Sequence, residues 1–116
     1  MNVSTPLKHV NLKHFLEVCG DDEATMKELM TEITREIPIE MEKLNQASTQ
    51  SDWEEVFQIA HKLKMTFSFL GNEELDKLVK VTEFSARHKI DVKEIPALVK
   101  EMTHHADLVM EELLVG

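Results

Sequence analysis

Apolar residues recur every three to four positions along almost the whole chain, and this helical period constrains the fold more than any other feature. The longest stripes of this kind run from Met26 to Leu44 and from Trp53 to Leu70. Only 3 Gly, 3 Pro and no Tyr occur in 116 residues, which disfavours a β architecture rich in turns. The pattern predicts an all-α protein of one domain over residues 1–116, in which residues 1–8 form a flexible N-terminus.

Start and stop signals divide the first half of the pattern into two helices. A short helix is expected to end at Gly20, because glycine readily takes the left-handed conformation found at helix ends. A long helix follows, since Asp21 and Asp22 can cap its N-terminus, and Pro38 is expected to kink it. The apolar positions are Leu12, Phe15, Leu16 and Cys19 in the short helix, and Met26, Leu29, Met30, Ile33, Ile37, Met41 and Leu44 in the long one.

The third and fourth helices are predicted to be separated by a single tight turn. The run Ser51-Asp52-Trp53-Glu54 has the form of a capping box that opens the third helix, with the serine as the cap. Gly71 closes this helix, and the fourth opens at Asn72 and runs to about Lys89. The apolar positions are Trp53, Val56, Phe57, Ala60, Leu63, Phe67 and Leu70 in the third helix, and Leu75, Leu78, Val79, Thr82 and Ala86 in the fourth.

A last long helix completes the pattern. Asp91 and Glu94 offer a second capping pair, and Pro96 is tolerable only in the first turn. Four long amphipathic helices with short connections predict an antiparallel four-helix bundle, with the short additional N-terminal helix capping one end. The apolar positions of the last helix are Ile95, Leu98, Val99, Met102, Ala106, Val109 and Leu113.

Charge and cysteine content narrow the choice of partners and compartment. The formal net charge of −9 disfavours binding to nucleic acid or to an anionic membrane surface. The single cysteine, Cys19, cannot form an internal disulfide, which suits a reducing cytosol. No apolar run approaches the ~20 residues of a membrane span, and Met1 to Pro6 lacks the regions of a signal peptide. We expect a cytoplasmic, monomeric protein, and the initiating Met1 favours a small free-standing one.

His61 is expected at the edge of the buried face of the third helix. At about 100° per residue, with Ala60 at the centre of that face, His61 lies at about 100°, where side chains begin to meet water. Met65 at about 140°, Gln58 at about 160° and Phe69 at about 180° are expected to face solvent beside it. Exposed apolar groups next to a reactive polar group suggest a docking surface.

The stretch Ala60-His61-Lys62-Leu63-Lys64, followed by Leu70-Gly71 and an apolar helix, resembles the signature of the histidine-containing phosphotransfer (HPt) domain of two-component signalling. The pattern of that family is Ala-His-x-Leu-Lys-Gly, a run of small residues, Leu-Gly, and a Glu or Gln on the next helix, where this chain has Glu83. Met65 departs from the pattern, because it replaces the glycine that lets a partner approach. The matching positions are Ala60, His61, Leu63, Lys64, Thr66, Ser68, Leu70 and Gly71.

The resemblance implies a role for each polar residue near His61. Nε2 of His61 would attack the phosphoryl group of a receiver domain's phospho-aspartate, and the reverse step would load a second receiver. Glu83 would accept a hydrogen bond from Nδ1–H and so orient the ring. Lys64 would bring its ammonium near the developing negative charge, and Lys62 is a weaker candidate because it points about 100° further round. The docking contacts implied are Gln58, Lys62, Met65, Ser68 and Phe69.

The resemblance also implies which components the partners supply. The sequence has no Gly-rich phosphate cradle, so we expect no ATP-dependent kinase activity and no cofactor of its own. Mg²⁺ is expected on the partner receiver domain. The expected partners are response-regulator receiver domains and a hybrid sensor histidine kinase.

Two other classes of function stay open at this point. A helical adaptor could keep the bundle and bind a receiver or kinase without accepting phosphate. A carboxylate-bridged di-metal bundle needs a Glu-x-x-His motif on each of two helices, and only Glu101 to His104 supplies one. The other histidines are read as surface or rim residues, namely His9, His14, His88, His104 and His105.

Overall fold

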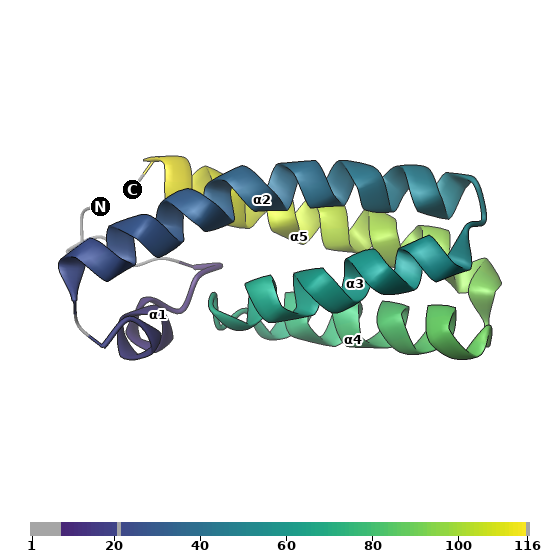
Figure 1. Cartoon of the computed structure of the whole chain (residues 1–116), viewed down its shortest axis with the longest axis horizontal. Coiled ribbons are helices and arrows are strands. Elements are labelled where there is room, and N and C mark those ends of the chain that lie inside the picture. The colour runs from purple at the N-terminus through teal and green to yellow at the C-terminus, as the bar shows by residue number, and fades with distance from the viewer. Residues whose placement is uncertain (1–7, 21, 116) are drawn as a thin grey trace.

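Four long helices lie side by side and a short one closes one end of them (Figure 1). The computed structural model describes residues 8–20 and 22–115, and these residues contain no β-strand. Each long helix packs on two others, in the cyclic order α2, α3, α4, α5, in a body of 43 × 21 × 21 Å. This confirms the predicted all-α bundle with a short leading helix. The elements are α1 (Leu12–Val18), α2 (Glu23–Thr49), α3 (Trp53–Ser68), α4 (Glu73–His88), the 3₁₀ helix η1 (Val92–Glu94) and α5 (Ile95–Val115).

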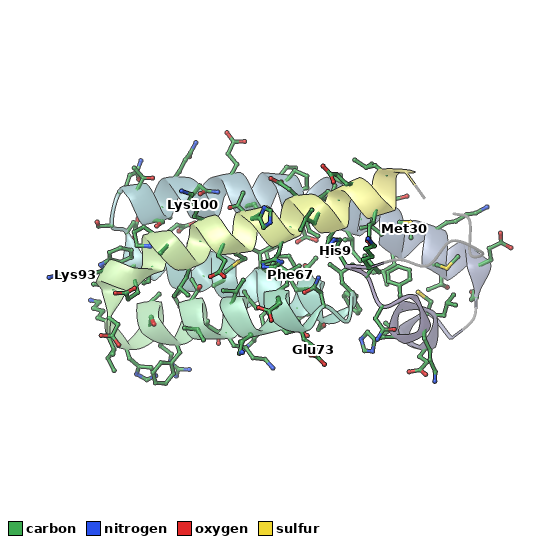
Figure 2. All side chains as sticks on the ribbon, turned by 180° about the vertical axis from the view of Figure 1, so that it is seen from behind. His9, Met30, Phe67, Glu73, Lys93 and Lys100 are labelled. Atoms are coloured by element: carbon green, nitrogen blue, oxygen red, sulfur yellow. The ribbon has the colours of Figure 1, made fainter. Side chains whose placement is uncertain are left out.

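The apolar stripes of the four long helices form one core. Leu44 of α2, Leu63 and Phe67 of α3, Val79 of α4 and Met102 of α5 are completely buried, and Figure 2 shows Phe67 between the helices. Full burial of one such side chain contributes ~1.5–3 kcal/mol relative to exposure, so the core is the main source of stability. None of the helices in the described residues combines the length and the apolar character needed to cross a membrane.

The long helix α2 continues through Pro38 without interruption. Proline has no backbone N–H, so the carbonyl of Thr34 lacks its usual helical partner at this turn. In Figure 1 the N-terminal part of α2 slopes relative to the rest of its ribbon. Asp22 is the N-cap and accepts from the amide of Ala24 at 3.1 Å, whereas Asp21 lies outside the described residues.

Two predicted helix caps were wrong in their detail. Ser51 has φ +56° and is part of the turn before α3, and Asp52 is the cap, with Oδ1 accepting from the amide of Glu55 at 3.2 Å. Asp91 also has positive φ, and its backbone carbonyl, not its carboxylate, accepts from the amide of Glu94 at 2.9 Å. Both tight turns use a left-handed residue, and Asp91, which directly precedes η1 as its N-cap residue, makes no side-chain capping hydrogen bond there.

The other two predicted helix starts are confirmed. Asn72 caps α4, because its side-chain oxygen accepts from the amide of Leu75 at 3.0 Å. Pro96 is the second residue of α5 and therefore lies in the first turn, where its missing N–H costs no helical hydrogen bond.

The segment before α1 forms hydrogen bonds with α5 and with the start of α4. The carboxylate of Glu112 on α5 accepts hydrogen bonds from the successive amides of Lys8, His9 and Val10, at 2.7–3.0 Å. The side-chain amide of Asn72 donates to the carbonyl of His9 at 2.7 Å, and Figure 2 shows His9 at this junction. The structure does not describe the residues before Lys8, so most of the predicted flexible segment 1–8 lies outside it.

Candidate functional site

His61 lies in the middle of α3, at the edge of its buried face. The residue before it, Ala60, is completely buried, whereas the His61 side chain is 59% exposed, so the predicted rim position is confirmed. On the side of α3 away from His61, the buried face is wider than the predicted one, because Ile59 and Thr66 are also buried. That side carries Lys62, which contacts α2, so α2 covers it.

Glu83 of α4 connects two candidate side chains of α3, His61 and Lys64. Nδ1 of His61 lies 3.0 Å from Oε2 of Glu83, and Nζ of Lys64 donates to Oε1 at 2.9 Å. His61 and Lys64 both reach this carboxylate because residues three apart share one face of a helix. The predicted contact between Glu83 and Nδ1 is therefore present in the structure.

The electrostatics of Glu83 determine which nitrogen of His61 is free. Burial of this side chain, 16% of which is exposed, works to raise its pKa, but hydrogen bonds from Lys64 and His61 outweigh burial, and the pKa of Glu83 is lowered. An ionised carboxylate only accepts hydrogen bonds, so Nδ1 of His61 carries the hydrogen. The lone pair of the neutral ring is then on Nε2, which has no hydrogen-bond partner among residues 8–20 and 22–115.

An aromatic and a cationic side chain complete the rim beside His61. The ring of Phe57, one turn earlier on α3, lies 5.9 Å from the imidazole, between ring centroids. The guanidinium carbon of Arg87 lies 5.9 Å from the centroid of the same Phe57 ring. Sequence reasoning missed Arg87, although its position four residues after Glu83 places both residues on one face of α4.

The predicted docking residues fall into two groups. Gln58, Met65 and Ser68 are exposed, with Met65 at 65%, as the helical angles predicted. The prediction that Phe69 faces solvent was wrong, because Phe69 is partly buried and packs against the core. It follows the last residue of α3, where α1 covers the bundle end: Nε2 of His14 donates to the carbonyl of Ser68 at 2.7 Å.

Lys62 is directed away from His61. Its Nζ lies 3.0 Å from Oε1 of Glu40 and 3.3 Å from Oε1 of Glu36, both on α2. The hydrogen bond to Glu40 is the main reason why the pKa of Lys62 is raised. A contact with a partner would have to replace these ion pairs, so Lys62 stays the weakest of the predicted docking residues.

The part of the chain that the structure describes contains no candidate metal site. No group of three or more His, Cys, Asp or Glu side chains there could hold a metal ion. The Glu101 to His104 motif therefore has no partner motif among these residues.

Comparison with known proteins places this site within a family. The crystal structure of histidine-containing phosphotransfer protein B (HptB) from Pseudomonas aeruginosa PAO1 matches with a TM-score of 0.81 over 93% of each chain, which shows a common fold at 20% sequence identity. No curated protein matches the chain. The family model described as Hpt domain matches residues 15–108, which include His61, Lys64 and Glu83. The chain belongs to the Hpt domain family, whose members act as histidine phosphotransfer modules in phosphorelays.

Proposed function

We propose that this protein is a phosphorelay intermediate that carries a phosphoryl group on Nε2 of His61. The observation that carries the proposal is the exposed imidazole whose Nδ1 is bound to Glu83, because this leaves the Nε2 lone pair directed at solvent. A neutral imidazole is available as a nucleophile at cellular pH. The surrounding apolar and polar rim gives a partner a surface on which to dock.

The transfer proceeds in two balanced steps. The Nε2 lone pair attacks phosphorus of a receiver's phospho-aspartate, the P–O bond to the aspartate breaks, and its electron pair returns to the carboxylate. A second receiver's aspartate then attacks phosphorus, and the N–P bond breaks with its electron pair returning to Nε2 of His61. Lys64, whose ammonium is 2.9 Å from Glu83, can turn toward the phosphoryl oxygens and offset their developing charge.

The partners in this proposal are receiver domains and a hybrid sensor kinase. Mg²⁺ stays with the receiver, and the protein acts as a carrier with no ATP-dependent kinase activity. Gln58, Met65 and Ser68 form the exposed contact surface beside His61, and Phe69 packs against the core just after the end of α3. We also propose a monomer in the cytoplasm that binds neither nucleic acid nor membrane, in keeping with a net charge of −9.

Transfer from a phosphorylated receiver tests the proposal. Wild-type protein and His61→Gln are mixed with phosphorylated receivers and Mg²⁺, and acid-labile, base-stable phosphate is measured on each. We expect label on wild type alone, with circular dichroism showing that the variant is folded. A receiver complex of unchanged affinity in His61→Gln, together with no label on wild type, would support a non-phosphorylated adaptor instead.

Met65 is the residue most suited to control which receivers fit. It lies one turn after His61, is 65% exposed, and replaces a glycine of the family pattern. We expect Met65→Gly to change the ranking of transfer rates across a panel of receivers, because a flexible thioether in the contact is removed. Equal proportional changes for every receiver would show that Met65 does not select among them.

A further inference from the structure

The partner of Nδ1 in this site is a carboxylate, which restricts what His61 can become. An amide could accept a hydrogen bond or turn and donate one, but an ionised carboxylate can only accept. Nδ1 of His61 is 3.0 Å from Oε2 of Glu83, and the lowered pKa of Glu83 keeps this carboxylate ionised at neutral pH. The contact is therefore satisfied only while Nδ1 carries a proton.

Phosphorylation of Nε2 changes the charge of the ring and therefore the tendency of Nδ1 to lose its proton. When Nε2 has bonded to phosphorus and Nδ1 still carries hydrogen, the imidazole ring is positively charged. In water such a ring can release the Nδ1 proton and become neutral. Beside Glu83 the same release would bring a nitrogen lone pair and a carboxylate oxygen face to face at hydrogen-bond distance, which is repulsive.

We propose that the Glu83 carboxylate holds the proton on Nδ1 after Nε2 is phosphorylated, so that His61 carries its phosphoryl group on a protonated ring and gives it up quickly at neutral pH. This inference rests on the proposed function and concerns how long the phosphorylated state of His61 lasts. Glu83 acts through the ring of His61 and is therefore a positioning residue.

The balance of the second transfer explains why the proton matters. If the ring is protonated at Nδ1, breaking the N–P bond returns an electron pair to Nε2 and leaves a neutral imidazole. If the ring has lost that proton, the same cleavage would leave an imidazolate anion, a much poorer leaving group. A retained Nδ1 proton therefore removes any need for proton movement during transfer to an aspartate, and in hydrolysis only the attacking water has to release a proton.

The charged groups around His61 leave Oε2 of Glu83 free to hold the proton on Nδ1. On α3, Lys64 occupies the other oxygen of Glu83, so it lowers the negative charge of the carboxylate but does not block Oε2. On α4, the guanidinium carbon of Arg87 lies over the ring of Phe57, 5.9 Å from its centroid, so its contact is with Phe57 rather than with Glu83.

The two acidic groups of α2 that contact α3 do not substitute for Glu83. Glu36 and Glu40 are both paired with Lys62 on the other side of α3. Glu83 is therefore the carboxylate through which the protonation of the phosphorylated ring can be tested.

The test uses chemical phosphorylation, which does not require a receiver. Wild type and the isosteric Glu83→Gln are phosphorylated with potassium phosphoramidate, and label lost in His61→Gln identifies the phosphate on His61. The hydrolysis rate of phospho-His61 and its ³¹P and ¹⁵N resonances are followed from pH 5 to pH 9. Glu54→Gln, an exposed change on α3, controls for the loss of one negative charge.

We expect phospho-His61 to last about three- to tenfold longer in Glu83→Gln at pH 7–8, the ratio given by replacing a charge-assisted hydrogen bond with a neutral one. The two proteins should converge at pH 5, where both rings are protonated, and the ring resonances of the variant should change at lower pH. Glu54→Gln should behave as wild type. A rate ratio that is constant across pH would indicate orientation alone, and identical profiles would also overturn the proposal.

A second measurement needs no variant. Phospho-His61 in native wild type should keep its Nδ1 proton to a higher pH than in the same protein unfolded in urea, and equal behaviour would contradict the proposal. Failure of every receiver to transfer phosphate, with the expected pH profile still present, would remove the relay function and leave the chemistry of the site intact.

Discussion

Glu83 holds both His61 and Lys64, and it does so from a largely buried position on a neighbouring helix. One carboxylate with two charge-assisted partners fixes the relative position of the imidazole of His61 and the ammonium of Lys64. The same arrangement makes Glu83 a contributor to stability as well as to the site.

At the residue scale, we predict that the contribution of Glu83 to stability depends on pH. Its pKa in the folded protein is below the ordinary 4.5, so the stabilisation is present above pH 4.5 and is lost as the pH falls through the folded pKa. Glu83→Gln should lower the free energy of unfolding by about 1 kcal/mol at pH 7. Urea unfolding from pH 7 to pH 3 checks this, and a difference that persists unchanged at pH 3 would contradict it.

At the element scale, two glycines with the same backbone angle provide a matched pair. Gly71 and Gly20 both have φ +65°. A Cβ added to Gly71 would lie 2.7 Å from Cβ of Asn11, whereas a Cβ added to Gly20 would meet no heavy atom within 4 Å apart from its chain neighbours. The turn between α3 and α4 is thus in direct contact with the segment that leads into α1.

We predict that Gly71→Ala destabilises the protein more than Gly20→Ala. Gly20→Ala should cost only the left-handed penalty of about 1 kcal/mol. Gly71→Ala should cost about 2–4 kcal/mol, because Asn11 must also move. Urea unfolding of both variants measures the difference, and equal effects would show that α1 yields without resistance.

The start of α3 gives a second element-scale prediction. Asp52 accepts from the amide of Glu55, whereas Ser51 is in the left-handed region and its backbone cannot act as the cap. Asp52→Ala should therefore reduce the free energy of unfolding by about 1 kcal/mol, and Ser51→Ala by only a few tenths, ~0.3 kcal/mol. The reverse order in thermal or urea unfolding would restore Ser51 as the cap.

At the scale of the whole molecule, the N-terminal segment and the last helix are joined by one side chain. Glu112 accepts from three consecutive amides, and the segment they belong to also bonds to Leu70 and Asn72 at the turn between α3 and α4. Through these contacts the first described residues connect α5 to the C-terminal end of α3 and to the start of α4.

We predict that Glu112→Gln loosens this connection. The neutral amide accepts less strongly, so hydrogen exchange of the amides of residues 8–10 should accelerate, and the free energy of unfolding should fall by about 1–2 kcal/mol. Glu111→Gln, an exposed change at the adjacent position, is the control. Unchanged exchange at residues 8–10 would mean that Glu112 does not hold the segment.

The helical class, the number of long helices and the position of His61 on the rim follow from apolar periodicity, because this periodicity is a local property of each helix. The sequence also indicated Gly71 and Asn72 as the boundary between α3 and α4, since both act through their own backbone neighbourhood. The pairing of His61 with Glu83 was expected only through the family resemblance.

Tertiary structure decided what depends on neighbours. Phe69 is covered because the bundle end beside it is closed by α1, and Lys62 is held because α2 presents two glutamates to it. The left-handed turn at Ser51 moved the cap of α3 to Asp52, and the one at Asp91 left its carboxylate without a capping hydrogen bond, because the chain must reverse within a few residues there. Glu112 gained its role from amides more than one hundred positions away. The environments of Phe69, Lys62 and Glu112 are set by contacts between segments distant in the chain, and the two turns are set by where the chain reverses. A period along one helix specifies neither.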